Sequence, residues 1–295
     1  METQHKQFLI GLPGNGKTTF LAALWYVLFA KEVDTALKFV RLSTENAHLN
    51  RIAKLWADVQ PVERTFLGVE KYVSMFLKVP RSSHEIEIVF PDLSGESFVA
   101  QWKDRQMKSE HAELIREALG GLLLIHPEKV IDDYWITEIA PLADAIRPEE
   151  RVTNELPISG ASGASEASGN SAKPVWDPQE APTQMQLVDL LQFVAALNNR
   201  RPIRLAVVVS AWDRINENHP PESWVELYLP LLWQYLRSNP ETFVCAFYGV
   251  SAQGGALEDA DRLRKTVYPS HRIRVVKSGE SESHDITAPV RWVMG

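Results

Sequence analysis

Cysteine is almost absent from this sequence, and positive charge is in short supply. The 295 residues include one cysteine, Cys245, so the chain cannot form a disulfide bond within itself, and a reducing compartment suits it best. Acidic residues outnumber basic ones by 38 to 31, and the net charge is −7. This balance argues against broad electrostatic binding to nucleic acid or to an anionic membrane surface. We therefore expect a cytoplasmic protein that does not bind nucleic acid directly.

Long apolar runs are also missing. The most apolar stretch, residues 20–30, is about eleven residues long, whereas a membrane span needs about twenty. It directly follows Lys17, and a glycine-rich loop occupies the place where the core of a secretory signal would lie. The sequence therefore predicts no membrane segment and no secretory signal, and we interpret the stretch as a buried helix of a sheet protein.

The first clear motif is the stretch FLIGLPGNGKTT at residues 8–19, in which a short apolar run breaks into Gly-x-x-x-x-Gly-Lys-Thr. A glycine-rich loop exposes backbone N–H groups to phosphate oxygens, Lys17 would reach the β- and γ-phosphates, and the Thr18 hydroxyl would bind Mg²⁺. The helix that begins behind the loop adds the positive end of its dipole. Pro13 lacks an N–H and stiffens the loop. The predicted phosphate-binding residues are Gly11, Pro13, Gly14, Asn15, Gly16, Lys17, Thr18 and Thr19.

Strands and helices alternate along the rest of the chain. This pattern predicts an α/β fold of the P-loop NTPase type, with a mostly parallel sheet of about six strands and helices on both faces. Two neighbouring strands are joined by only a few turn-forming residues, so we expect a hairpin that places one antiparallel strand at the sheet edge. The expected strands are residues 6–10, 69–79, 85–90, 121–126, 203–210, 242–250 and 272–276, and the expected helices are residues 18–30, 47–59, 97–119, 185–199 and 222–237.

Residues 147–183 differ in composition from their surroundings. They are rich in serine, glycine and proline and have too few large apolar residues to form a core. The segment could be a boundary between two domains. We prefer a flexible insertion within a single domain of residues 1–295, because the motifs of the first half continue beyond it.

A second motif follows the strand predicted at residues 85–90. Asp92 would stand at the carboxyl end of this strand and face the Mg²⁺ held by Thr18, most often through a water. Gly95 would let a backbone N–H approach the γ-phosphate, where a side chain would obstruct it. Alone, Asp-x-x-Gly marks only a turn. Its position after an apolar strand of a phosphate-loop protein favours the functional interpretation.

The third and fourth motifs each follow a later strand. Asp213, in Ser210-Ala211-Trp212-Asp213, could accept hydrogen bonds from N1–H and the exocyclic amine of guanine, which adenine cannot supply. Taken alone, Asp213 could equally be an N-cap that ends its strand. Ser251 and Ala252 begin a loop of small residues whose backbone could contact the O6 edge of guanine. We interpret residues 126–129, which also follow a strand, as a strand end terminated by proline.

In this order the four motifs resemble those of the Ras-like GTPases of the translation-factor-related P-loop class, which are the phosphate loop, Asp-x-x-Gly, Asn-Lys-x-Asp and Ser-Ala-Lys. The resemblance implies a switch I threonine that completes the Mg²⁺ shell, for which Thr65 is better placed than Thr44. It also implies catalysis by Lys17, Glu96 and Thr65, with Glu96 where many members have the glutamine that orients water. Arg64 could be an arginine finger in cis, although an exposed arginine is the simpler interpretation.

The chain also departs from this pattern. Ser210 and Trp212 replace the asparagine and lysine of the base motif, and Gln253 replaces the lysine of the last motif. We expect Ser210 to take over the asparagine's hydrogen bonds and Trp212 to cover the base, with weakened guanine affinity. A carboxylate at Glu96 near phosphate charge predicts slow hydrolysis. The divergent base motif and the polar insertion resemble bacterial GTPases of conflict or defence systems, including the double-GTPases.

The leading hypothesis is a Mg²⁺-dependent GTPase switch. GTP would order the segments near Thr65 and Gly95 through γ-phosphate contacts, and a protein effector or regulator would read them. One alternative is an ATP-hydrolysing P-loop protein in which Asp213 is only a cap. Another is a nucleotide-binding scaffold with little turnover.

Overall fold

The computed structural model describes residues 4–42, 47–62, 71–81, 85–92, 95–132, 180–215 and 219–295. The strands are β1 (Gln4–Ile10), β2 (Lys38–Leu42), β3 (Lys71–Lys78), β4 (Ile86–Asp92), β5 (Gly120–Ile125), β6 (Ile203–Ser210), β7 (Phe243–Ser251) and β8 (Arg274–Lys277). The α-helices are α1 (Lys17–Ala30), α2 (Ala47–Ala57), α3 (Gly95–Asp104), α4 (Ser109–Glu117), α6 (Thr183–Leu197), α7 (Pro221–Tyr228), α8 (Pro230–Ser238), α9 (Ala260–Leu263) and α10 (Ala288–Met294).

All eight strands form one sheet in the order β2-β3-β4-β1-β5-β6-β7-β8. The five strands from β4 to β7 in this order run parallel. Strands β3 and β2 extend the sheet antiparallel at one side, and β8 pairs antiparallel with β7 at the other. The carboxyl ends of the five parallel strands therefore meet at one edge of the sheet, which is where ligands bind in open α/β folds.

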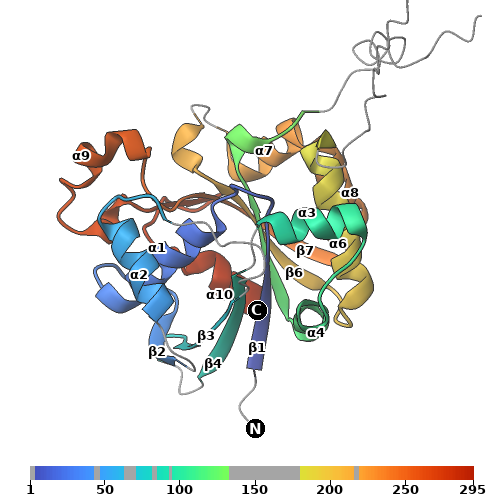
Figure 1. Ribbon diagram of the computed structural model, residues 1–295, viewed down its shortest axis with the longest axis horizontal. Helices are drawn as coiled ribbons and strands as arrows, with labels where there is room; N and C mark the ends of the chain where they lie inside the picture. Colours follow the sequence, from blue (N-terminus) through green and yellow to red (C-terminus); the bar gives the residue numbers. More distant parts are fainter. Residues whose placement is uncertain are drawn as a thin grey trace, which may run out of the picture.

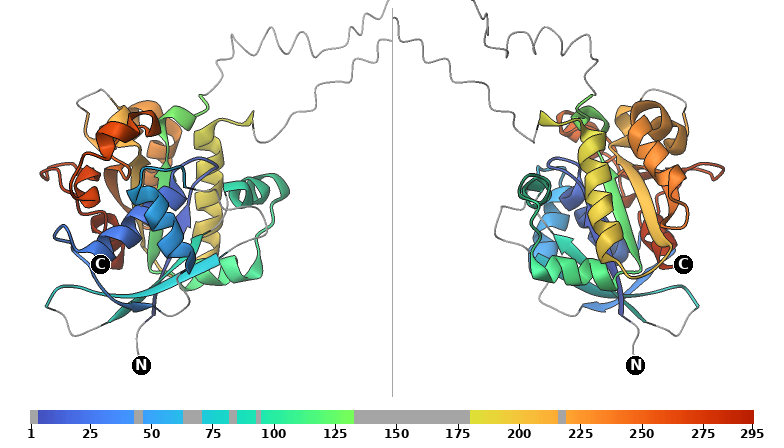
Figure 2. Two further views of the ribbon diagram at one scale, coloured as in Figure 1. Left: turned by 60° about the vertical axis from the view of Figure 1, so that its left-hand side comes forward. Right: turned by 90° about the vertical axis from the view of Figure 1, so that its right-hand side faces the viewer.

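Helices cover both faces of the sheet (Figures 1 and 2). Alternate residues of the parallel strands point to opposite faces. On β5, Leu122 and Leu124 pack in a core with α1, α2 and α10, whereas Leu123 and Ile125 pack in a second core with α3, α4 and α6 to α8. Because both faces are covered, β5 is buried along its whole length, which explains its unbroken apolar sequence.

The predicted fold class is confirmed, but the predicted sheet is too small. Seven expected strands are present, and β3 and β4 form the expected antiparallel hairpin. The hairpin strand is not at the edge, since β2 pairs outside it, and β8 is antiparallel as well. Strand β2 is only five residues long and half-buried, so it lacks an apolar run. Between β7 and β8 the chain forms only short helical segments, the longest of them four residues, and β8 then pairs antiparallel with β7.

Two predicted helices are each divided in two. The helix expected at residues 97–119 ends at Asp104, where Arg105 adopts a left-handed conformation with φ 55°, and a new helix begins at Ser109. The helix expected at residues 222–237 is interrupted between Tyr228 and Pro230. Proline at the first position of α8 has no N–H to continue the preceding helix, so the interruption follows from the local sequence.

The expected insertion falls mostly outside the described residues, which resume at position 180. Ala181 and Thr183, at its expected end, are both buried, and Thr183 is the first residue of α6. The described helices also bear on the predicted absence of a membrane segment: each of them is too short or too polar to cross a bilayer.

The position of β7 predicts an inert thiol. Burial raises the pKa of Cys245 to about 12. Relative to its ordinary value of 9.0, this lowers the thiolate fraction near neutral pH roughly a thousandfold. We expect the native protein to react with a thiol-specific aromatic disulfide far more slowly than the urea-unfolded protein at the same pH. Cys245 is the sole cysteine, so the signal has one source. Equal rates in the two states would contradict the placement of this residue.

Candidate functional site

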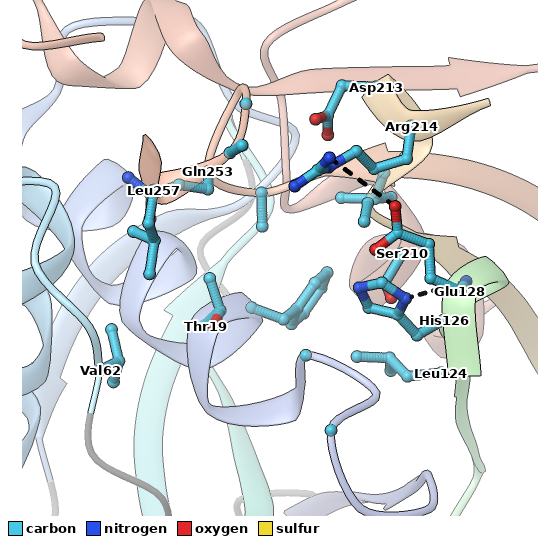
Figure 3. A pocket seen from close by; sticks show the side chains of 18 of the residues that line it. Thr19, Val62, Leu124, His126, Glu128, Ser210, Asp213, Arg214, Gln253 and Leu257 are labelled. Atoms are coloured by element: carbon cyan, nitrogen blue, oxygen red, sulfur yellow. Dashed lines mark hydrogen bonds and ion pairs between the residues drawn. The ribbon is translucent and has the colours of Figure 1, made fainter. Parts of the chain in front are cut away.

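The loops that follow β1, β5, β6 and β7 surround a pocket of about 240 Å³ at the carboxyl edge of the sheet (Figure 3). The pocket combines apolar walls with a few polar side chains, as is typical of small-molecule sites. Of the residues predicted to bind nucleotide, six line it: Gly14, Gly16, Thr19, Ser210, Asp213 and Ala252. The structure therefore brings residues of the first, third and fourth motifs to one place.

The phosphate loop has the backbone that its glycines predict. Gly14 and Gly16 have φ angles of 78° and 82°, which non-glycine residues rarely adopt. Between them, the buried Asn15 donates from Nδ2 to the carbonyl oxygen of Leu124, at 2.8 Å. This bond ties the loop to β5. Helix α1 starts at Lys17, so its N-terminal N–H groups face the space above the loop.

Lys17 closes the loop on itself. Its Nζ donates to the carbonyl oxygens of Gly11, at 2.5 Å, and Leu12, at 3.1 Å. The side chain is only 7% exposed, and its Nζ lies 5.4 Å from the ring centroid of Phe98. These contacts hold the ammonium group against the loop backbone. Thr18 is next in α1 and half-buried, and Thr19 faces the pocket.

Asp213 and Ser251 are in direct contact. The Ser251 hydroxyl donates to Oδ1 of Asp213 and accepts a hydrogen bond from the backbone N–H of Gly254, at 3.1 Å. Asp213 lies inside a 3₁₀ turn, Trp212–Arg214, whose N-cap is Ala211 without a side-chain cap bond. The N-cap of the next described helix is Pro220. The carboxylate of Asp213 therefore faces Ser251 and the pocket rather than capping either of these helices.

Two expectations for the base motif are wrong. Trp212 does not cover the pocket: it is buried in the core beneath α6 to α8, and its ring fills the space where a Cβ on Gly249 would lie, 2.3 Å from Trp212 Cδ2. Ser210 does not take over an asparagine's hydrogen bonds. Its Oγ is buried with no hydrogen-bond partner in the part of the chain that the structure describes.

The second motif is placed only through its backbone. Asp92 ends β4, and because β4 pairs in parallel with β1, its Cα lies level with the end of β1 that leads into the phosphate loop. Gly95 and Glu96 form the first turn of α3. Thr65, Thr44 and Arg64 lie outside the described residues, so their predicted roles stay predictions.

The structure adds pocket residues that the sequence analysis missed. His126 and Glu128 come from the turn after β5, which we had interpreted as a mere strand end. Arg214 lies between two carboxylates, 3.7 Å from Glu128 and 3.9 Å from Glu258. Gln60 and Val62, which follow α2, form a further part of the wall. The available signal for His126 and Glu128 was the presence of polar residues, on either side of Pro127, directly after a buried parallel strand.

The family model described as Double-GTPase 1 matches residues 8–293. No curated protein sequence matches the chain. Among solved structures, the chain is similar to the GDP-bound RocCORdC fragment of Roco2 from Methanosarcina barkeri, with 11% sequence identity and a TM-score of 0.33. That match covers 89% of this chain but 48% of the Roco2 chain, so this chain spans about half of that fragment.

The turn after β5 predicts a pH dependence of stability. His126 Nδ1 accepts a hydrogen bond from the backbone N–H of Glu128, at 3.2 Å (Figure 3). Burial lowers the pKa of His126 below its ordinary value of 6.5. As pH falls below about 6.5, the unfolded chain takes up a proton that the folded chain does not, so the free energy of unfolding decreases. We expect His126→Asn, which keeps a capping oxygen, to lose less stability than the wild type between pH 7.5 and about 5.5.

Urea unfolding at the two pH values measures this difference. His219→Asn is the matched control, since His219 is exposed and lies away from the pocket lining. We expect this variant to retain the wild-type pH dependence. If His126→Asn also retains it, the half-buried imidazole of His126 is not the source of the pH dependence.

Proposed function

The chain belongs to the Double-GTPase 1 family, and on this premise we propose that it binds GTP and GDP in the pocket described above and hydrolyses GTP. The observation that carries the proposal is the pairing of Asp213 with Ser251 beside a phosphate loop. It places an oriented carboxylate within one pocket with the residues expected to hold phosphate.

Guanine is the base that fits this carboxylate. It presents two neighbouring donors, N1–H and the 2-amino group, and Asp213 offers two acceptor oxygens. The Ser251 hydroxyl fixes the orientation of the carboxylate before a ligand arrives, so less ordering is needed on binding. Adenine has an acceptor at N1 and no 2-amino group, so it would leave the carboxylate unpaired.

The other end of the nucleotide would lie on the phosphate loop. The N–H groups of the loop and of the start of α1 would donate to phosphate oxygens. The Lys17 ammonium group would give up a hydrogen bond to a loop carbonyl and donate to a phosphate oxygen instead. The available ligands also fit Mg²⁺, which takes oxygen donors and is usually held by phosphates with one or two side chains. Thr18, Asp92 and Thr65 are the residues that would hold it. Bound Mg²⁺ would neutralise charge on the phosphates.

Hydrolysis needs a positioned water and compensation of phosphate charge. Glu96, in the first turn of α3, would orient the water, and Thr65 and the Gly95 backbone would contact the γ-phosphate. A carboxylate close to phosphate is electrostatically unfavourable, so turnover would be slow. Loss of the γ-phosphate would release the Thr65 and Gly95 segments.

We further propose a protein effector or regulator that reads these two segments, as in a molecular switch. The acidic chain and its lone cysteine favour a role in the cytoplasm without direct nucleic-acid binding. The family and the divergent base motif favour a role in a bacterial conflict or defence system.

Asp213→Asn should change which base the protein prefers. The amide keeps one acceptor but replaces the other with a donor, so it suits xanthine, which has an N1–H donor beside a 2-oxo acceptor. We expect GDP affinity to fall by about 2–3 kcal/mol, roughly 30- to 150-fold, and affinity for xanthosine diphosphate to rise. Competition against a fluorescent nucleotide at fixed Mg²⁺ measures both.

Asp259→Asn is the control, because Asp259 pairs with Arg262 on the surface and does not line the pocket. We expect it to bind all nucleotides as the wild type does. A wild-type preference for ADP over GDP, or an Asp213→Asn variant with unchanged base preference, would refute the guanine assignment.

Lys17→Ala tests turnover. The substitution removes the ammonium group expected at the β- and γ-phosphates, so we expect phosphate release from GTP under multiple-turnover conditions to fall at least about tenfold. Circular dichroism checks that the variant is folded. Equal and negligible release by both folded proteins would instead identify a nucleotide-binding scaffold.

A further inference from the structure

Contacts on two sides hold residues 251–255, which comprise the end of β7 and the loop after it. We call this segment the base loop. On one side, the buried Ser251 bonds to Asp213, which lines the pocket. On the other side, the carbonyl oxygen of Ala252 accepts a hydrogen bond from the indole Nε1–H of Trp56, at 2.9 Å. Trp56 belongs to α2, which packs on α1 and is remote in sequence from the base loop.

Trp56 is itself rigidly placed. Its side chain is 0% exposed, and its ring centroid lies 5.0 Å from that of Tyr26 on α1. Tyr26 donates from its hydroxyl to Glu32, at 3.0 Å, and Glu32 accepts from the backbone N–H of Ser270, at 3.0 Å. A side chain fixed on several sides can transmit position to the group it bonds, because packed cores deform little.

The carboxyl end of α2 is bound by residues that follow β7. The buried guanidinium of Arg272 donates to the carbonyl oxygens of Trp56, at 3.1 Å, and Ala57, at 3.2 Å, and Gln253 of the base loop donates to that of Trp56, at 3.3 Å. Arg264 donates to the carbonyl oxygen of Asp58, at 3.0 Å. These donors satisfy carbonyls that a helix end leaves unpaired, and the arginine charges suit its negative dipole end.

The chain leaves α2 through a tight turn and then enters the pocket wall. Val59 is left-handed, with φ 52°, which is unfavourable for a β-branched residue. The N–H of Gln60 reaches back to the carbonyl oxygen of Leu55, at 2.8 Å, and closes the turn. Gln60 and Val62 then line the same pocket as Ala252. The end of α2 thus contacts the base loop and supplies part of the wall.

We propose that Trp56 is a positioning residue for guanine recognition. Its indole N–H holds the Ala252 carbonyl, and so fixes the Ser251-Ala252 backbone that would face the O6 edge of the base. Arg272 holds the helix end from which Trp56 acts. This inference rests on the proposed function and assigns to α2 a role in base selection. By linkage, a bound guanine base stabilises the position of α2 as much as that position favours the base.

Trp56→Phe tests the proposal, with Trp25→Phe as its matched control. Both substitutions remove a buried indole donor on this face of the sheet, but Trp25 donates to Asn50 and not to the base loop. We expect Trp56→Phe to weaken GDP binding about three- to tenfold, as loss of one hydrogen bond implies. Binding of ADP and inorganic pyrophosphate should stay at wild-type values, so the GDP-to-ADP preference falls by the same factor. Trp25→Phe should leave that preference unchanged.

Competition binding with GDP, ADP and pyrophosphate supplies the constants, and thermal unfolding shows whether the variants are folded. Should Trp56→Phe not fold, Arg272→Lys provides the second variant: it keeps the charge but replaces the two guanidinium nitrogens that bond the Trp56 and Ala57 carbonyls with a single ammonium nitrogen, and we expect the same selective loss. An equal loss for GDP and pyrophosphate, or an equal loss in Trp25→Phe, overturns the proposal. If the wild type prefers GDP over ADP and the variants keep this preference in full, this inference alone is overturned. A wild type without that preference overturns the guanine assignment and this inference with it.

Discussion

The parallel hydrogen-bonded register of β4, β1, β5, β6 and β7 is the constraint on which the site depends. Parallel pairing forces every one of these strands to end at the same edge, so the loops that follow them must converge. The phosphate loop, the His126 turn, Asp213 and Ala252 are far apart in sequence but share one pocket for this reason. The two cores fix the register, because a shift by one residue would move each apolar side chain to the opposite face.

Within this frame, two hydrogen bonds hold the segments around the pocket in place. Asn15 binds the phosphate loop to Leu124 near the end of β5, and Ser251 binds the end of β7 to Asp213. The first bond joins the loop after β1 to the neighbouring strand β5, and the second joins β7 to the turn after its neighbour β6. Such bonds place the polar groups before a ligand arrives, which reduces the ordering that binding requires. Because of these bonds, a displacement of one segment would also displace the segment bonded to it.

The sequence was sufficient for the features that local chemistry decides. A glycine-rich loop between an apolar strand and a helix needs particular residues at particular positions, so Gly14, Gly16 and Lys17 were identifiable without a structure. Trp212 was misjudged because an aromatic side chain can cover a base or fill a core, and only the space above Gly249 decides between them. Strands β2 and β8 were harder, since short half-buried strands leave little periodic signal. The contact of Trp56 with Ala252 links residues 196 positions apart, which no local pattern encodes.

Because the base motif diverges, the base loop is held partly by residues outside that motif. The Ser210 hydroxyl forms no hydrogen bond within the described residues, and the Trp212 ring packs in the core, so neither side chain supports the pocket through a polar contact. The contacts that remain come from Ser251 on one side and from Trp56, with Arg272 behind it, on the other. A loop supported by a helix on the sheet face is only as well placed as that helix. On the proposal for Trp56, base selectivity depends on how the carboxyl end of α2 is held, by the packing of Trp56 on Tyr26 and by the hydrogen bonds from Arg272. Residues of the four motifs alone do not determine this.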